Sequence, residues 1–296
     1  MGNKLIRALW GDLSNEELKK FSLLALGFFF LIGSFWPLKI LKDVVFINTV
    51  GSIFQPDAKI MSLFVFFPLV LIYSKLVDYF SKEKLLYLLV AASTVIGLVF
   101  VYFFYHPTIG LSNTSQGQHR LIGWLFYLFV ESYISLMVSL YWAFISDITT
   151  PESAKKGYGM LIFGSQLGGV IFTVLGSFLA YDTSLYATRA PIIALISILV
   201  FLLVAVVVFF LTRIIAREEL VGYVETKKIE ESKESVGFFD GLKILIGCPY
   251  VGGIFGMVFF HEVVSALMHY QMLRTVELTF LSNQGLVNKF MFNYAF

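Results

Sequence analysis

The 296-residue chain has few charged residues: Asp, Glu, Lys and Arg make up only 14% of it, and the formal net charge is +2. Because soluble domains carry about a quarter charged residues, this composition argues against a soluble globular enzyme. The small net charge also excludes a nucleic-acid binder that works through a basic surface. The single cysteine, Cys248, excludes an intramolecular disulfide and a Cys-based metal site.

Apolar residues are abundant: they make up 58% of the chain, which contains 32 Phe. A helix that spans a bilayer needs about 20 mostly apolar residues. The segment Leu199–Phe210 shows no alternation of apolar and polar residues, which argues against an outer-membrane barrel. We therefore predict an all-α, polytopic transmembrane bundle. Seven spans fit this length: Phe21 to about Ile47, Ile60–Val77, Leu85–Tyr105, Leu121–Ser146, Tyr158–Tyr181, Ala190–Thr212 and Pro249–Leu273.

The distribution of Lys and Arg predicts the orientation of these spans. With a cytoplasmic N-terminus, 15 basic residues lie on the inner side and 7 on the outer side, as the positive-inside rule favours. The first apolar run is too long for a signal peptide and no cleavage site follows it, so we expect a permanent helix. The predicted parts are a cytoplasmic N-terminal segment (1–20), a six-helix bundle (21–213), a cytoplasmic charged linker (214–248), a seventh helix (249–273) and an outer tail (274–296).

Two short motifs predict local structure. Ser14 and Glu17 have the spacing of a capping box, which predicts that the first helix begins there. Gly164 and Gly168 form G-x-x-x-G, a pattern that lets transmembrane helices approach closely. The outer tail ends in Phe292-Asn-Tyr-Ala-Phe296, which is typical of the start of a further helix, so we expect a longer protein.

Ionisable residues inside a membrane span are costly and usually face a cavity or a partner. Glu131 lies near the middle of the fourth span. At helical spacing it shares a face with aromatic and hydroxyl side chains, which predicts either a cavity wall or ordinary packing around a structural carboxylate. The other members of this face are Trp124, Tyr127, Ser135, Ser139 and Trp142.

Two other spans contain charged positions. Lys39 and Lys42 share a face of the first span, and Asp43 lies four residues beyond Lys39. They predict an anion site, or else a salt bridge and a snorkelling lysine. The seventh span contains a pair, His261 and Glu262, and a later histidine, His269, which indicate a polar cavity or a proton-coupling role. A metal site needs three or four converging ligands, so we expect none here.

A series of short motifs follows the chain in order. They are Glu17–Phe21, Leu38–Asp43 (similar to "R-x-x-K-D"), Lys59 with Pro68, Tyr73–Leu76, Ser81–Lys84, Glu131–Trp142, Ile148–Lys155 (similar to "I-T-x-x-E-A-K") and Pro249–Gly253. In this order they resemble the nucleotide transporter family, the ATP/ADP translocases of intracellular bacteria and plastids. This resemblance implies a twelve-helix, major-facilitator-like carrier, of which the chain holds the N-terminal half plus one further helix. It also implies nucleotide exchange and functional charges at Glu131 and at Lys42 or Lys39.

Three functional hypotheses remain open from the sequence. The first is exchange of ATP for ADP by alternating access in a bacterial inner membrane, with no cofactor. The second is a carrier of another solute coupled to protons through Glu131, Glu262 or His261. The third is a truncated relative that binds without transporting. Because the helices of a second half are missing, transport would require self-association or another chain. The lipid bilayer and a nucleotide are the expected partners, and nucleic acid is not.

Overall fold

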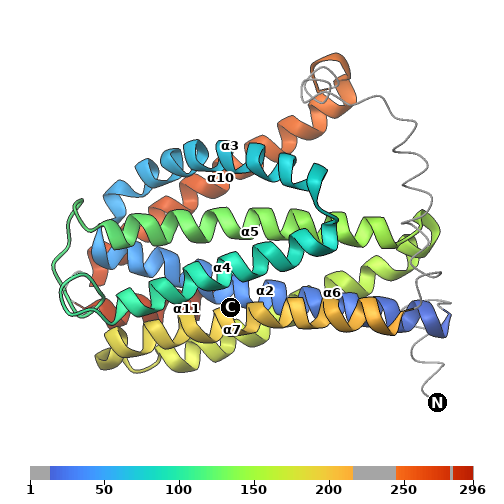
Figure 1. Ribbon diagram of the computed structural model, residues 1–296. Coiled ribbons are helices and arrows are strands. Elements are labelled where there is room, and N and C mark those ends of the chain that lie inside the picture. The colour runs from blue at the N-terminus through green and yellow to red at the C-terminus, as the bar shows by residue number, and fades with distance from the viewer. Residues whose placement is uncertain (1–13, 216–244, 281–282, 296) are drawn as a thin grey trace.

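The computed structural model describes residues 14–215, 245–280 and 283–295, and these residues form helices and no strands. The predicted segment 1–20 and linker 214–248 lie mostly outside the described residues. Figure 1 shows the helices arranged as one elongated bundle. The elements are α2 (Asn15–Thr49), η1 (Ser52–Phe54), α3 (Gln55–Tyr79), α4 (Lys82–Phe104), α5 (Leu121–Ile148), α6 (Pro151–Ala180), η2 (Thr183–Leu185), α7 (Tyr186–Ile214), α10 (Pro249–Phe280) and α11 (Gln284–Tyr294).

Seven of the described helices are long and apolar enough to cross a membrane, which confirms the predicted all-helical, multi-span class. The capping box is also confirmed. The Ser14 hydroxyl accepts the Glu17 N–H at 3.1 Å, and the Glu17 carboxylate accepts the Ser14 N–H at 3.0 Å. Helix α10 extends to Phe280, seven residues past its predicted end at Leu273, and part of the predicted tail forms α11.

The central helix α2 packs most closely against α6, through the predicted G-x-x-x-G motif. A Cβ atom on Gly168 would lie 2.0 Å from the Phe29 carbonyl oxygen, and one on Gly164 would lie 2.7 Å from the Ala25 carbonyl oxygen. No side chain fits between backbones this close. The two glycines therefore set the distance between α2 and α6, as the motif predicts.

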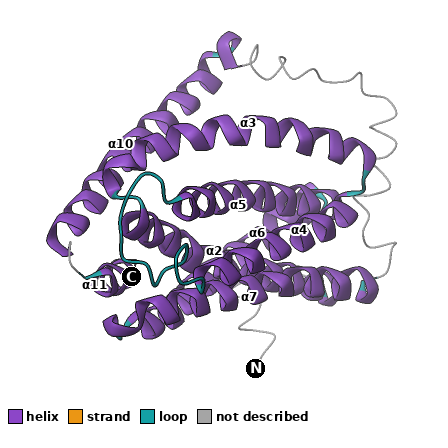
Figure 2. Cartoon of the chain, turned by 60° about the vertical axis from the view of Figure 1, so that its left-hand side comes forward, coloured by secondary structure: helices purple, strands orange, loops and turns teal. Residues whose placement is uncertain are grey.

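The bundle has two distinct ends. We call the end that holds the start of α2 the proximal end, and the end that holds Thr49, the α4–α5 loop and α11 the distal end. Figures 1 and 2 both show α3 and α10 along one side of the bundle and α7 along the opposite side. The three buried residues of α10, Leu273, Val276 and Glu277, all lie near its distal end.

Candidate functional site

A cavity of about 620 Å³ lies between α2, α3, α5 and α10. Helix α2 contributes the charges of Lys39 and Lys42, and α5 contributes that of Glu131. The first turns of α3 and the central turns of α10 complete the lining. The volume is within the range of about 300–1,000 Å³ that small-molecule sites occupy. The acidic, basic and histidine side chains in the lining are Lys39, Lys42, Lys59, Glu131, Glu262 and His269.

One carboxylate oxygen in this cavity binds two lysines. Glu131 Oε1 accepts hydrogen bonds from Lys42 Nζ and, at 3.0 Å, from Lys59 Nζ. Lys42 is only 3% exposed, whereas Lys59 is 45% exposed. The Lys42 ammonium also lies 4.3 Å from the centre of the Tyr127 ring. The cluster therefore reaches from a buried charge on α2, through α5, to an accessible charge on α3.

A second contact joins α2 to α10. Asp43 is 2% exposed, and its carboxylate lies 3.3 Å from Lys42 Nζ and 3.1 Å from His269 Nε2. The spacing in α2 allowed Asp43 to pair with Lys39, but the structure pairs it with Lys42 instead. Lys39 lies over an aromatic ring one turn earlier, with its Nζ 4.8 Å from the centre of the Trp36 ring. Asp43 is therefore free to bind Lys42 and the facing helix.

Lys39 differs from the other two cavity lysines in its lack of a carboxylate partner. Among the described residues, no Asp or Glu oxygen lies within salt-bridge distance of its ammonium group. The side chain is half-buried and lines the cavity. A half-buried cation without an ion partner is suited to bind an incoming anion.

The structure separates the predicted α5 face into cavity and packing positions. Glu131 and Ser135 line the cavity, but Trp124, Tyr127 and Trp142 do not belong to its lining. Trp124 and Trp142 are 18 positions apart, which is about 27 Å along a helix, so one cavity cannot hold both. The Trp124 ring contacts Phe46, the Trp142 ring contacts Phe28 and Tyr158, and Tyr127 is fully buried beneath Lys42.

The predicted positions on α10 also separate. Glu262 and His269 line the cavity, whereas the His261 side chain is exposed and lies outside the lining. Adjacent helical positions point about 100° apart, which explains why His261 and Glu262 do not act together. No cluster of three His, Cys, Asp or Glu side chains suited to a metal ion exists within the described part of the chain.

Sequence analysis did not place Lys59 among the site residues. It lies next to the predicted start of the second span, where a lysine usually reaches toward the membrane surface. The motif resemblance included Lys59, and this was the one signal that singled it out. Only the packing of α3 against α5 shows that its ammonium reaches Glu131.

Comparison with known proteins gives related carriers. The chain is 26% identical over 282 residues to ADP,ATP carrier protein 5 of Rickettsia prowazekii, a match that covers 84% of this chain and 55% of the relative. It is 25% identical over 291 residues to ADP,ATP carrier protein 3 of Rickettsia felis, covering 85% and 57% respectively. The chain thus spans about half the length of the curated relatives it matches. No solved structure matches it significantly.

The family comparison covers nearly the whole chain. The model of the TLC ATP/ADP transporters matches residues 2–296. The seven candidate spans and the charged cavity between them agree with a membrane carrier. The chain therefore belongs to the TLC ATP/ADP transporter family, a family of carriers and not of enzymes.

Proposed function

We propose that this chain is a nucleotide carrier, or the N-terminal portion of one, that exchanges ATP for ADP by alternating access. The observation that carries the proposal is the lysine-rich cavity between α2, α3, α5 and α10. Polyphosphates are bound by cationic donors, and such bonds are strongest where water is excluded. Three lysines around one cavity supply this chemistry.

The lysines have different parts in the proposed binding step. Lys39 has no carboxylate partner among the described residues and would attract the first phosphate oxygen. Lys42 and Lys59 both bind Glu131. A bound polyphosphate brings oxygens that replace the Glu131 carboxylate around both ammonium groups. Glu131 would re-form these contacts when the nucleotide leaves.

This competition provides a reason for exchange. While nucleotide is bound, its phosphates pair with the lysines; without it, Glu131 joins α3 to α2 through a network of opposite charges. The empty and loaded states thus differ in which groups bridge these helices. If the conformational change requires Glu131 to release Lys42 and Lys59, it can occur only after a nucleotide has bound. A carrier with this property exchanges one nucleotide for another.

Transport by rocking also needs a second half. We propose that helices from a further part of the protein, from a second copy or from another chain face the exposed sides of α3 and α10. The Lys and Arg count supports a cytoplasmic proximal end, and with it an outward-facing distal end. We place the carrier in a bacterial inner membrane.

A second candidate function is a proton-coupled carrier of another solute. The favouring observation is the contact of 3.1 Å between His269 Nε2 and the buried Asp43 carboxylate at the cavity. A histidine–carboxylate pair is suited to gain and release a proton. A non-transporting relative, which binds nucleotide without moving it, is the third.

Uptake of labelled ATP into proteoliposomes separates these functions. Vesicles would contain ADP, no nucleotide, or ADP together with a pH gradient. Exchange requires internal ADP and disappears in a Lys42→Ala, Glu131→Ala variant, but not in Lys75→Ala, which removes an exposed lysine of α3. Uptake that follows the pH gradient without internal ADP would favour the proton-coupled carrier. Binding without uptake would favour the non-transporting relative.

A further inference from the structure

Helix α10 is attached to the rest of the chain at its distal end. Its buried residues are Leu273, Val276 and Glu277, and its first two-thirds, from Pro249 to Tyr270, has none. Figure 1 shows the orange ribbon of α10 leaving the bundle toward its N-terminal end. Beside the cavity, α10 therefore lies close at the distal end and apart at the proximal end.

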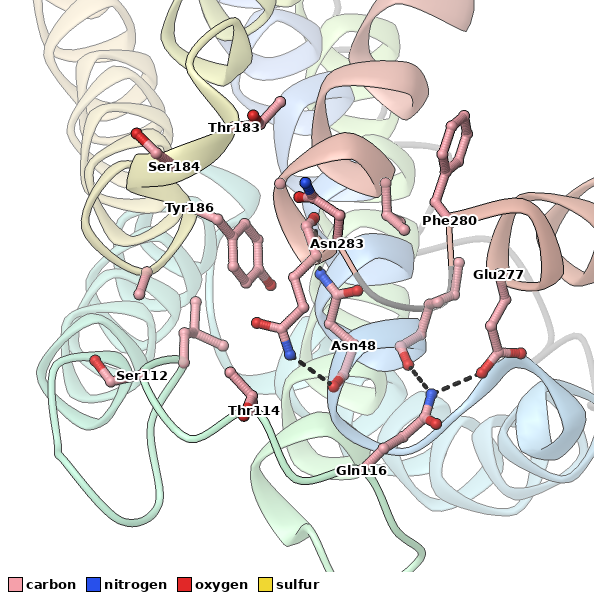
Figure 3. A pocket seen from close by; sticks show the side chains of 16 residues that line it. Asn48, Ser112, Thr114, Gln116, Thr183, Ser184, Tyr186, Glu277, Phe280 and Asn283 are labelled. Atoms are coloured by element: carbon pink, nitrogen blue, oxygen red, sulfur yellow. Dashed lines mark hydrogen bonds between the residues drawn. The ribbon is translucent and has the colours of Figure 1, made fainter.

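A carboxylate is at the centre of this attachment. Glu277 is 5% exposed and accepts hydrogen bonds from two segments outside α10, the α2–α3 turn and the α4–α5 loop. Its Oε2 binds the N–H of Ser52, at 3.0 Å, and the Ser52 hydroxyl. Its Oε1 accepts a hydrogen bond of 2.6 Å from Gln116 Nε2 in the α4–α5 loop, as Figure 3 shows. Glu277 thus joins α10 to the α2–α3 turn and to the α4–α5 loop.

The partners of Glu277 are also held in place by contacts that do not involve Glu277. Gly51 has a φ of 114°, a conformation favoured by glycine, and the resulting turn presents the Ser52 N–H to the carboxylate. Arg120 is 6% exposed and donates four hydrogen bonds of 2.7–3.0 Å, which hold the α4–α5 loop. The Gln116 amide also binds the Ile47 carbonyl at 2.7 Å, which fixes its direction. The four carbonyl partners of Arg120 belong to Ile109, Gly110, Asn113 and Ser115.

A second polar contact joins the distal end of α2 to α11. We call the contacts of α10 and α11 with the distal end of the bundle the seam. The Asn48 amide donates to the Gln284 carbonyl and the Gln284 amide donates to the Asn48 carbonyl, both at 3.3 Å. A hollow of about 500 Å³ remains between these residues, and the buried Tyr186 hydroxyl that lines it has no hydrogen-bond partner among the described residues. Hydrogen bonds, with incomplete packing, hold this seam together, so water can replace them when it opens.

Glu277 can leave the seam without becoming an unpaired charge. Arg274 lies one turn earlier on the same helix, and its Nη1 is 3.1 Å from Glu277 Oε2. This contact moves with α10, whereas Ser52 and Gln116 stay with the bundle. Removing a carboxylate from all of its partners is costly, and the arginine avoids that cost.

We propose that Glu277 is a gating residue. Its hydrogen bonds to Ser52 and Gln116, which we call the latch, keep the cavity between α2, α3, α5 and α10 closed at the distal end, and the cavity opens there when these bonds break. The proposal rests on the carrier function proposed above, because only a carrier needs the cavity to open at both ends in turn. The closed latch corresponds to the state described here, in which α10 is held distally and diverges proximally.

The test measures access to the cavity and needs no transport. Ser135→Cys places a thiol in the cavity lining, and Cys248→Ser removes the single native cysteine. A membrane-impermeant maleimide is added separately to each side of oriented vesicles that contain the full chain. Glu277→Gln is compared with Asp57→Asn, a matched change at an exposed carboxylate in the first turn of α3.

We expect Glu277→Gln to raise the labelling rate from the distal side by about tenfold, because hydrogen bonds to a charged group are lost. Asp57→Asn should leave this rate unchanged. Equal distal rates in both variants, with normal labelling from the proximal side, would overturn the proposal. If Glu277→Gln does not fold, Gln116→Ala removes one partner with Glu277 in place and should act in the same direction. Absence of ATP/ADP exchange in the unsubstituted chain, with the labelling effect intact, would reject the carrier function and leave the latch.

Discussion

Lys59 Nζ lies 3.0 Å from Glu131 Oε1, the same oxygen that binds Lys42. One carboxylate of α5 thus forms ion pairs with a buried lysine of α2 and an accessible lysine of α3. This sharing makes Glu131 a competitor of any anion that enters the cavity, and it gives the carboxylate and the lysines opposite expected effects on binding.

Glu131→Gln should separate nucleotide binding from exchange. The amide leaves Lys42 and Lys59 without their shared carboxylate, so ATP binding should be retained or strengthened. Exchange should fall, because no carboxylate replaces the phosphates around the lysines when the nucleotide leaves. Lys42→Ala should weaken binding by about tenfold or more, since it removes a charge-assisted contact. Equilibrium binding by calorimetry, together with exchange in proteoliposomes, gives both quantities. Weakened ATP binding in Glu131→Gln would contradict this mechanism.

Lys59→Gln should raise the KM for nucleotide and leave thermal stability almost unchanged. Lys59 is 45% exposed, so its ion pair contributes little to stability, but its ammonium faces the cavity. Lys75→Gln changes an exposed lysine of the same helix outside the cavity and is the control. Equal KM values for the two variants would remove Lys59 from the site.

Asp43→Asn should destabilise the folded protein by about 3 kcal/mol, because it removes a buried charge next to Lys42 and weakens the contact with His269. Asp57→Asn, which changes an exposed carboxylate, should have almost no effect. Thermal unfolding in detergent, monitored with a fluorescent dye that does not react with thiols, measures the difference in unfolding temperature between the two variants. If both variants unfold at the same temperature, the buried network does not stabilise the fold.

Gly168→Ala should separate α2 from α6 and lower the unfolding temperature. The new Cβ would lie 2.0 Å from the Phe29 carbonyl oxygen, so backbone must move. Gly159→Ala is the matched control on the same helix, because its Cβ would meet no atom within 4 Å apart from the neighbouring backbone of its own helix. The control should stabilise α6 by up to about 1 kcal/mol through helix propensity. Similar unfolding temperatures for both variants would show that α2 and α6 tolerate a wider separation.

Arg120→Lys should loosen the α4–α5 loop. Four carbonyl oxygens accept hydrogen bonds from the planar guanidinium of Arg120, and a lysine ammonium has only three donors. Limited proteolysis of the loop measures the effect, and cleavage should be faster than in the unsubstituted chain. Arg213→Lys, at the last turn of α7, is the control. Unchanged cleavage in Arg120→Lys would show that the loop does not depend on these bonds.

Much of the fold was predictable, because the bilayer limits a chain of this composition to helices of a known length. The seven spans, the capping box at Ser14 and the close approach at Gly168 all follow from local sequence. The first span extends at both ends beyond its predicted limits, and α10 extends past Leu273, since helices continue beyond the apolar core of the membrane. The placement of cytoplasmic and outer segments and the identity of the transported solute remain predictions.

The candidate site was predictable in part. Lys42, Glu131 and Glu262 were recognised because a charge inside an apolar span needs a partner or a cavity, and the structure brings all three to one cavity. Lys59 and Glu277 were not recognised, because they lie near the ends of their helices, where a charge is ordinary. Nothing in their local sequence shows which helix they face.

The amino-acid sequence by itself therefore determined that this protein is a multi-span helical bundle, and that the charges of Lys42, Asp43 and Glu131 lie within its spans. The tertiary structure alone decided how those charges pair: Asp43 with Lys42 and His269, Glu131 with two lysines, and Glu277 with Ser52 and Gln116. The physical reason is that helix rotation and crossing depend on contacts between distant segments, such as Gly168 against Phe29. Hydropathy determines where a helix lies along the chain, but not which neighbours its side chains meet.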